Sequence, residues 1–364
     1  MGSSTALDNE MHEFGYDASH LCVDLSNPID LDLLDHVLQS RWKSSMERGH
    51  FRYMLPSPIP STILPGRYNF ILQLNPDRGS KRRPPEQIAT LTQPFDPTRF
   101  HFNLVAPQEV LLQLRPWWDD QAHDHSLLIN VSPLETGHVL LTPHRSQNRA
   151  QALSRDGLRL ALELALLSRD PNFRVGFNSL CGYASVNHEH YHAYYLQHRL
   201  YLETAALRPL KSPTNTGSSS FCFELVDYPA PALVWTLERV EDLSALVERV
   251  MTVAKHLHAT NTAHNMFITR GETCSASSST PATPSHHSCL RVFLWARESS
   301  FGSKESDGFN PALCELAGHF PCKSEEAYGR LKEDGLVAIL RDLCAKSFAC
   351  LRAALVEGQF DNVA

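Results

Sequence analysis

Apolar residues recur every three or four positions along several stretches of the chain, which is the spacing of one face of an α-helix. This pattern first occupies residues 31–48. It is strongest over residues 153–168, where leucine and alanine, both good helix formers, dominate. Residues 240–258 and most of 324–356 show it again. We therefore predict four helical regions.

Shorter apolar and β-branched runs lie between these helices and predict β-strands. The predicted strands are 68–74, 88–91, 110–114, 126–131, 138–142, 173–178, 186–196, 221–236, 264–269 and 290–297. Strands mixed with segregated helices are typical of an α+β fold. Because both halves of the chain are rich in predicted strands, we interpret them as a diverged duplication.

The same patterns divide the chain into an irregular N-terminal segment (1–30), a first unit (31–210) and a second unit (221–360). Two stretches, 211–220 and 271–288, are rich in Ser, Thr and Pro and are not expected to pack. The second stretch separates two apolar runs, so we interpret it as a surface loop between strands.

Charge and cysteine content restrict the partners. The 33 basic and 40 acidic residues leave a formal net charge of −7, which gives no general attraction to nucleic acid or anionic lipid. The apolar stretches fall short of the ~20 residues of a membrane helix, and the first residues do not form a signal peptide. Nine cysteines include no C-x-x-C pair. We expect a cytoplasmic protein with reduced thiols that binds neither nucleic acid nor membranes.

Three histidines at alternate positions carry the clearest chemical signal. Residues 176–196 read GFNSLCGYASVNHEHYHAYYL and contain His188, His190 and His192. On a β-strand, alternate side chains face the same side, so a strand here places three imidazoles on one face and Glu189 on the other. The possible interpretations are a nucleophilic site, a zinc site, a solvated polar strand face, or coincidence.

The neighbouring residues favour the nucleophilic site. A neutral imidazole can attack phosphorus and form a covalent intermediate, provided that a second group holds its other ring nitrogen. Gly176, Gly182, Ser179, Ala184 and Ser185 are small enough for a phosphate to approach the backbone closely. Because the sequence offers no obvious acidic or cysteine ligand beside the histidines, we expect neither a metal ion nor another cofactor.

Two motifs in this order resemble those of the histidine-triad superfamily. Ser185 precedes the His-x-His-x-His run by three residues, and Asn178 lies seven residues further upstream. The upstream stretch NVSPLETGHVLLTP (130–143) is similar to the superfamily's first motif, P-x-x-x-G-H-x-L-x-x-P, with His138 as its histidine.

The resemblance narrows to the GDP-hexose phosphorylases over about residues 40–330. Four blocks support it: 73–103, 129–143, 176–196 and 294–320. This family includes the plant GDP-L-galactose phosphorylase and the animal GDP-D-glucose phosphorylase. The third triad residue is His192, as in the animal type, where the plant type carries Gln. The resemblance implies the galactose-1-phosphate-uridylyltransferase-like histidine-triad fold, with related halves around antiparallel sheets and only the first half catalytic.

The family resemblance also implies roles for individual residues. His190 is the nucleophile that accepts the GMP group, and His188 and His192 orient it and contact phosphate oxygens. Asn178 and Ser185 match positions that hold the phosphate and the ribose side. The other expected substrate-binding residues are His138, Ser179, Arg78, Lys81, Arg82 and Arg83. One position differs from the family pattern: Glu189 stands where the superfamily prefers an apolar residue. Because its side chain is expected to face away from the nucleotide, this difference concerns the packing of the strand more than the chemistry.

Several of these residues also have a structural interpretation. The run from Arg78 to Arg83 is either the basic patch that a diphosphate requires or a solvated turn. The ELAGH stretch (315–319) either contacts the hexose or caps a helix, and we favour the cap. We interpret Phe95, Asp96, Phe102 and Asn103 as turn and core residues.

The implied reaction is phosphorolysis of GDP-D-glucose by inorganic phosphate, which gives GDP and glucose 1-phosphate through a guanylyl-His190 intermediate. One alternative is a nucleotide-sugar hydrolase that releases GMP. The other is a catalytically idle nucleotide-binding protein, against which the intact triad argues. Hexose selectivity, the residues that contact guanine and the oligomeric state do not follow from the sequence.

Overall fold

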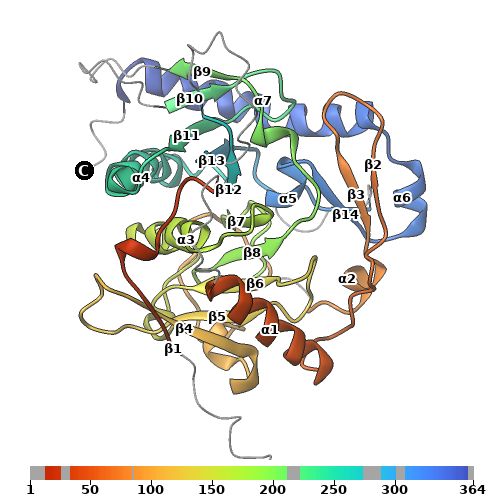
Figure 1. Cartoon of the computed structure of the whole chain (residues 1–364). Helices are drawn as coiled ribbons and strands as arrows, with labels where there is room; N and C mark the ends of the chain where they lie inside the picture. The colour runs from red at the N-terminus through yellow and green to blue at the C-terminus, as the bar shows by residue number, and fades with distance from the viewer. Residues whose placement is uncertain are drawn as a thin grey trace, which may run out of the picture.

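The computed structural model describes residues 13–25, 33–83, 86–210, 222–273, 288–300 and 308–359 of the 364-residue chain. One eleven-stranded sheet runs through both halves, in the order β1-β4-β5-β6-β8-β7-β12-β13-β11-β10-β9 (Figure 1). Neighbouring strands are antiparallel, except that β1 pairs in parallel with β4 at one edge. Its strands are β1 (Glu13–Tyr16), β4 (Val110–Pro116), β5 (His125–Ile129), β6 (Val139–Thr142), β7 (Phe173–Asn178), β8 (Tyr191–Tyr195), β9 (Leu207–Leu210), β10 (Cys222–Leu225), β11 (Leu233–Leu237), β12 (His264–Gly271) and β13 (Cys289–Ala296).

The two halves of this sheet repeat one topology. In the first half, β4, β5 and β6 are followed by helix α3 (Arg155–Leu167) and by the pair β7 and β8. In the second half, β9, β10 and β11 are followed by helix α4 (Leu243–Ala259) and by the pair β12 and β13. The spatial orders, 4-5-6-8-7 and 9-10-11-13-12, correspond strand for strand and meet where β7 pairs with β12. This repeat agrees with the diverged duplication expected from the sequence.

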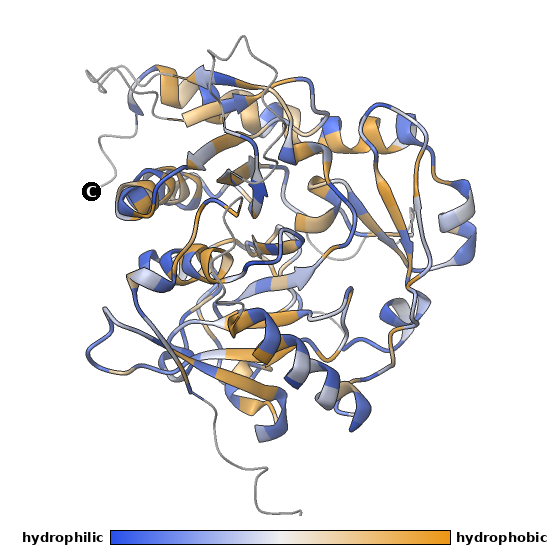
Figure 2. Cartoon of the chain, in the orientation of Figure 1, coloured by the Kyte–Doolittle hydropathy of each residue, from blue (hydrophilic) through white to orange (hydrophobic). Residues whose placement is uncertain are grey.

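Helices α1 (Leu33–Glu47), α3 and α4 cover one face of the sheet. Their apolar residues, such as Leu38, Leu162 and Val250, belong to one buried cluster together with strand residues such as Leu141 and Val175. Figure 2 shows the hydropathy pattern along these elements, with hydrophobic residues on the strands and hydrophilic ones on the outer sides of the helices. Burial of these apolar stripes therefore accounts for the helical periodicity of the sequence.

A smaller sheet and most of the remaining helices contribute to a second buried cluster, and the last helix contributes to both clusters. The smaller sheet contains β2 (Ser61–Ile63), β3 (Ile71–Leu74) and β14 (His319–Cys322), and the remaining helices are α2 (Pro76–Ser80), α5 (Leu313–Leu316), α6 (Glu325–Arg330) and α7 (Glu333–Val356). β14 pairs in parallel with β3, in the order β14-β3-β2. This pairing brings the segment after β3 close to the segment after β14, although about 250 residues separate them in the chain.

All four predicted helical regions contain a helix, and most of the predicted strands are present. The predicted strand 88–91 is wrong, because Ile88 and Leu91 lie in irregular backbone and pack against Leu180 and Ala184. The predicted strand 186–196 is too long, because β8 begins at Tyr191.

The N-terminal segment and the Ser-rich stretches differ in how far the structure describes them. Part of the segment 1–30 is regular, since residues 13–16 form β1. Residues 211–220 and 274–287 lie outside the described residues. Gly271 and Cys289 are Cα partners, so the second Ser-rich stretch connects two neighbouring antiparallel strands, as expected. Within the described ranges, no helix is long and apolar enough to cross a membrane.

Candidate active site

The triad lies where β7 and β8 diverge. The last paired residues are Gly176 and His192, so Asn178 would lie opposite His190 if the same register continued by two more residues. The side chain of Gln151 bridges this gap. Its Oε1 accepts the His190 N–H at 2.8 Å, and its Nε2 donates to the carbonyls of Asn178 and His190 at 2.8 and 3.1 Å. A buried amide therefore replaces the strand neighbour that His190 lacks.

The imidazole of His190 is oriented as a nucleophile requires. Its Nδ1 lies 2.8 Å from the carbonyl oxygen of His188, which can only accept, so Nδ1 carries the proton. The lone pair is therefore on Nε2. Burial, with a smaller contribution from the nearby Arg83, lowers the pKa of His190 to about 4, although the hydrogen bond to the His188 carbonyl acts in the opposite direction. The ring is neutral near pH 7.

The ring of His188 is held by contacts with residues of the 95–102 segment. Its Nδ1 accepts the backbone N–H of Phe102 at 3.1 Å, and the Phe102 ring stacks on it with centroids 5.6 Å apart. The same phenyl ring lies 5.0 Å from the His190 ring. Burial lowers the pKa of His188 to about 4. Phe102 therefore forms a wall of the site besides being a core residue, and Phe95 packs on His188 at 5.5 Å.

A chain of hydrogen bonds determines the tautomer of His192. The Leu134 N–H donates to Nδ1 of the fully buried His138 at 2.9 Å, so the neutral His138 ring carries its proton on Nε2. That nitrogen lies 3.1 Å from Nδ1 of His192 and donates to it. His192 is left with its proton on Nε2. Burial lowers the pKa of both rings well below the ordinary histidine value, so both are neutral.

Glu189 lies on the opposite side of the segment, as expected from its alternate position. It accepts a hydrogen bond from the Ser154 hydroxyl at 2.7 Å and from the Tyr191 hydroxyl at 3.2 Å. Ser154 is the N-cap of α3. Burial raises the pKa of Glu189 to about 7. Its role is to anchor the triad segment to helix α3.

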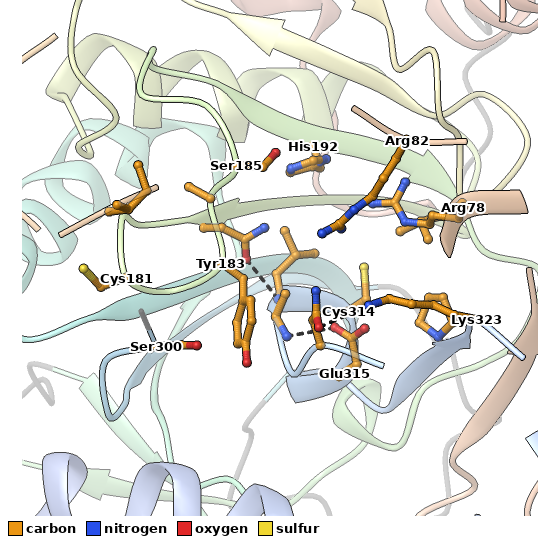
Figure 3. A pocket seen from close by; sticks show the side chains of 18 of the residues that line it. Arg78, Arg82, Cys181, Tyr183, Ser185, His192, Ser300, Cys314, Glu315 and Lys323 are labelled. Atoms are coloured by element: carbon orange, nitrogen blue, oxygen red, sulfur yellow. Dashed lines mark hydrogen bonds between the residues drawn. The ribbon is translucent and has the colours of Figure 1, made fainter. Parts of the chain in front are cut away.

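A cavity of about 1010 Å³, open mouth included, adjoins His192; we call it the central cavity (Figure 3). Its lining includes five of the residues expected from the sequence, namely Arg78, Arg82, Asn178, Ser185 and His192. Asn178 uses its Oδ1 to accept from Asn265 and from the Leu313 N–H, at 2.6 and 3.0 Å, which leaves its amide protons for a ligand. Ser185 is exposed in the lining. The structure therefore brings hydroxyl, amide, imidazole and guanidinium donors together.

The other expected residues do not line the central cavity. His188 and His190 are not part of its lining, but the ring centroid of His190 lies 5.3 Å from that of His192, which is. His138 supports His192 from behind. Lys81 forms an exposed ion pair with Asp77 at 3.0 Å.

Arg83 and Ser179 also lie outside the lining. The guanidinium of Arg83 covers the Phe100 ring at 3.1 Å, and burial lowers its pKa to about 10. The Ser179 hydroxyl donates to the Leu180 carbonyl and accepts the His264 N–H, both at 2.9 Å. Its hydrogen bonds are thus already made within the protein.

Several lining residues were not expected as ligands. Glu315 was assigned to a helix cap, and Lys323, Asn310 and Tyr183 were not singled out. Glu315 and Lys323 carry no local signal, because the pairing of β14 with β3 that brings their segment to the site is a long-range contact. Gln151 was also missed, since its role exists only where two strands separate.

Another histidine group lies outside the triad. Among the described residues, His123, His125 and His144 each offer a ligand atom within 4.8 Å of the others. Asp119 accepts from His125 Nε2 at 3.0 Å, and the His144 N–H donates to His125 Nδ1 at 3.2 Å. Both nitrogens of His125 are therefore engaged, so the group is a hydrogen-bonded cluster that a metal would have to disrupt. The expectation of a metal-free chemical step remains a prediction.

The fold and the triad define the class of the protein. The crystal structure of yeast Ap4A phosphorylase Apa2 in complex with Ap4A has a similar fold, with a TM-score of 0.55 over 86% of this chain and 97% of that chain. At 14% sequence identity, the likeness shows the fold alone. It confirms the α+β fold of the galactose-1-phosphate-uridylyltransferase-like form that the histidine-triad resemblance implied.

Sequence comparison identifies the family. The models "GDPGP1-like, N-terminal domain" and "GDPGP1-like, C-terminal domain" match residues 33–194 and 205–352. Human GDP-D-glucose phosphorylase 1 is 44% identical over 313 residues, which is 85% of this chain and 78% of the human one. GDP-L-galactose phosphorylase 1 of Arabidopsis thaliana is 30% identical over 331 residues, covering 85% and 70%. The chain belongs to the GDPGP1-like family.

Proposed function

We propose that the protein is a GDP-D-glucose phosphorylase, in which inorganic phosphate cleaves GDP-D-glucose to GDP and glucose 1-phosphate. The observation that carries this proposal is the hydrogen bond from His190 Nδ1 to the His188 carbonyl, which places the lone pair of a neutral ring on Nε2. The names of the relatives, GDP-D-glucose phosphorylase and GDP-L-galactose phosphorylase, support the substrate class.

The reaction has two displacements at the guanosine-side phosphorus. In the first, a bond forms from His190 Nε2 to this phosphorus, and the bond to the bridging oxygen breaks. Glucose 1-phosphate leaves with the electron pair. The imidazole is now cationic, and its Nδ1–H is stabilised by the His188 carbonyl. In the second displacement, an oxygen of inorganic phosphate attacks the same phosphorus, the phosphorus–nitrogen bond breaks, and GDP and neutral His190 are released.

Donors around the central cavity stabilise the charge that develops on the phosphate oxygens. His192 offers its Nε2–H, Asn178 its amide protons and Ser185 its hydroxyl, and preorganised donors of this kind contribute much of the catalysis at such centres. Arg78 and Arg82 neutralise the diphosphate through charge-assisted hydrogen bonds. These groups supply charge neutralisation from the chain itself, so we expect the chemical step to need no metal or other cofactor.

The second half of the chain completes the site in this account. The division into a catalytic unit (31–210) and a non-catalytic unit (221–360) remains a prediction, since one sheet continues through both. We also propose a cytoplasmic location, because the cysteines of the described part form no disulfide.

Product analysis tests the proposed function. Purified protein is incubated with GDP-D-glucose, with and without inorganic phosphate, and the nucleotides are separated. GDP that forms only with phosphate supports phosphorolysis. GMP in both reactions would instead establish the hydrolase, and unchanged substrate would establish an idle binding protein.

A further inference from the structure

Glu315 is a buried carboxyl group in the wall of the central cavity. It lies in the short helix α5 and is 6% exposed. Its Oε2 accepts the N–H of Ala312 at 2.9 Å, which caps the helix. Burial raises the pKa of this carboxyl to about 7. A helix cap alone does not require a carboxyl group that lines a cavity. The cap uses Oε2 of Glu315, so the carboxyl group can also accept hydrogen bonds from a ligand in the cavity.

The surroundings of Glu315 are polar and cationic. Figure 3 shows Glu315 across the cavity from Ser185 and His192, with Arg78 and Lys323 at one end. Arg78 acts electrostatically on both sides, because it lowers the pKa of His192 and also that of Glu315. Lys323 likewise lowers the pKa of Glu315, and its Nζ donates to Asn310 at 3.3 Å. Arg78 therefore acts on both His192 and Glu315, and Lys323 acts on Glu315.

The covalent order of the substrate fits this arrangement. In a GDP-hexose, the guanosine-side phosphorus is followed by the second phosphorus and then by the hexose. If the first phosphorus lies at the triad, the cationic side chains of Arg78, Arg82 and Lys323 are placed to bind the second phosphate. The group beyond these cations is the hexose, whose hydroxyls donate hydrogen bonds. A buried carboxylate is a strong acceptor for such donors.

We propose that Glu315 is a specificity-determining residue that accepts hydrogen bonds from hydroxyls of the hexose in the leaving sugar phosphate. This inference rests on the proposed function, since it assumes a sugar nucleotide as substrate. Two other roles make different predictions. A pure helix cap touches no substrate, and a carboxylate that binds the guanine edge changes the affinity for GDP itself.

The test combines the variant Glu315→Gln with deoxy analogues of the substrate. Glutamine keeps an oxygen that can accept the Ala312 N–H, so the cap is preserved. GDP-D-glucose and its 2-, 3-, 4- and 6-deoxy derivatives are each assayed for kcat/KM, and GDP affinity is measured by competitive inhibition. Glu163→Gln is the matched control, because Glu163 is also buried but its partners are Tyr16, Trp118 and Arg159, away from the cavity.

The proposal predicts that wild-type protein loses about 10- to 100-fold in kcat/KM on at least one deoxy sugar, as a missing hydrogen bond to a buried polar group requires. Glu315→Gln should lose a similar factor on GDP-D-glucose and little more on that deoxy sugar. Its affinity for GDP should stay within about twofold.

Three results would overturn the proposal. The first is a wild-type protein whose kcat/KM is the same on every deoxy sugar as on GDP-D-glucose. This result needs no variant, so it does not depend on whether a variant folds. Equal losses for Glu315→Gln on all sugars would leave only the cap. A parallel loss of GDP affinity would indicate guanine contact. If wild-type protein releases no GDP from GDP-D-glucose, it is the proposed function that fails.

Discussion

At the residue scale, burial and a single carbonyl make His190 reactive. Burial keeps the ring neutral, and the His188 carbonyl holds the proton on Nδ1. The alternate spacing of the histidines was readable from the sequence, because three histidines two residues apart are a specific pattern. The hydrogen bonds that set the tautomers were not, since they come from the backbone groups of Phe102 and Leu134, which any residue type would supply.

We expect His190→Asn to abolish turnover while the protein folds normally and retains most of its affinity for GDP. A nucleophile contributes to the transition state and the intermediate, and little to ground-state binding. Steady-state assays and GDP titration measure the two effects. Retention of more than a few per cent of the wild-type rate would exclude His190 as the nucleophile.

Gln151 acts through His190, so it is a positioning residue. Gln151→Leu leaves the His190 N–H and the two bridged carbonyls without their partner, and we expect kcat to fall about 10- to 100-fold with KM nearly unchanged. Gln113→Leu is the control, since Gln113 is equally buried and bonds to Ser126 in the sheet. If Gln151→Leu and Gln113→Leu lose the same stability and kcat does not fall more in Gln151→Leu than in Gln113→Leu, this role is contradicted.

At the element scale, the site depends on the seam between β7 and β12. The periodicity of the sequence predicted the helices α1, α3, α4 and α7 well, because each buries one apolar face. It failed for residues 186–190, where the expected strand is replaced by the Gln151 bridge. It also failed for residues 88–91, whose apolar side chains pack on a loop. Long-range pairing such as β14 with β3 leaves no local pattern, which is why Lys323 was missed and Glu315 was interpreted as a helix cap.

Gly176→Ala tests how tightly this seam is packed. A Cβ at Gly176 would lie 2.9 Å from the Met266 carbonyl oxygen and 3.0 Å from Leu313 Cδ1. We expect the free energy of unfolding to fall by about 1–3 kcal/mol, as is typical of overpacking. Gly15→Ala, in β1, meets no atom within 4 Å and should change it by less than about 0.5 kcal/mol. Similar urea midpoints for both variants would contradict tight packing, because they would mean that α5 and its Leu313 side chain can shift at little cost.

At the scale of the whole molecule, the duplicated sheet buries many titratable groups. Within the described ranges, seven buried histidines have lowered pKa values: His125, His138, His144, His188, His190, His264 and His319. The pKa of His192, which is partly exposed in the lining of the central cavity, is lowered as well. Three buried carboxyls have raised pKa values: Glu135, Glu189 and Glu315. Near pH 6 both sets are mostly in their neutral forms, and Glu189 and Glu315 ionise from about pH 7 upward.

These shifts predict a loss of stability in mild acid. Between about pH 4 and the ordinary histidine value of 6.5, the unfolded histidines bind protons that the folded ones refuse, so the free energy of unfolding falls as pH falls. The raised carboxyl pKa values act in the opposite direction between 4.5 and about 7 or 8, but they involve fewer groups. We expect a lower urea midpoint at pH 5 than at pH 7. An equal or higher midpoint at pH 5 would contradict the neutral, buried histidines.

The central claim is the covalent transfer through His190, and trapping the intermediate tests it most directly. Protein is mixed with GDP-D-glucose labelled in the guanosine-side phosphate, without inorganic phosphate, and the label is mapped by peptide analysis. We predict label on His190 that is labile in acid and stable in base, absent from His190→Asn, and released as GDP when phosphate is added. Label on another residue, or no labelled protein together with rapid GDP formation once phosphate is present, would contradict it.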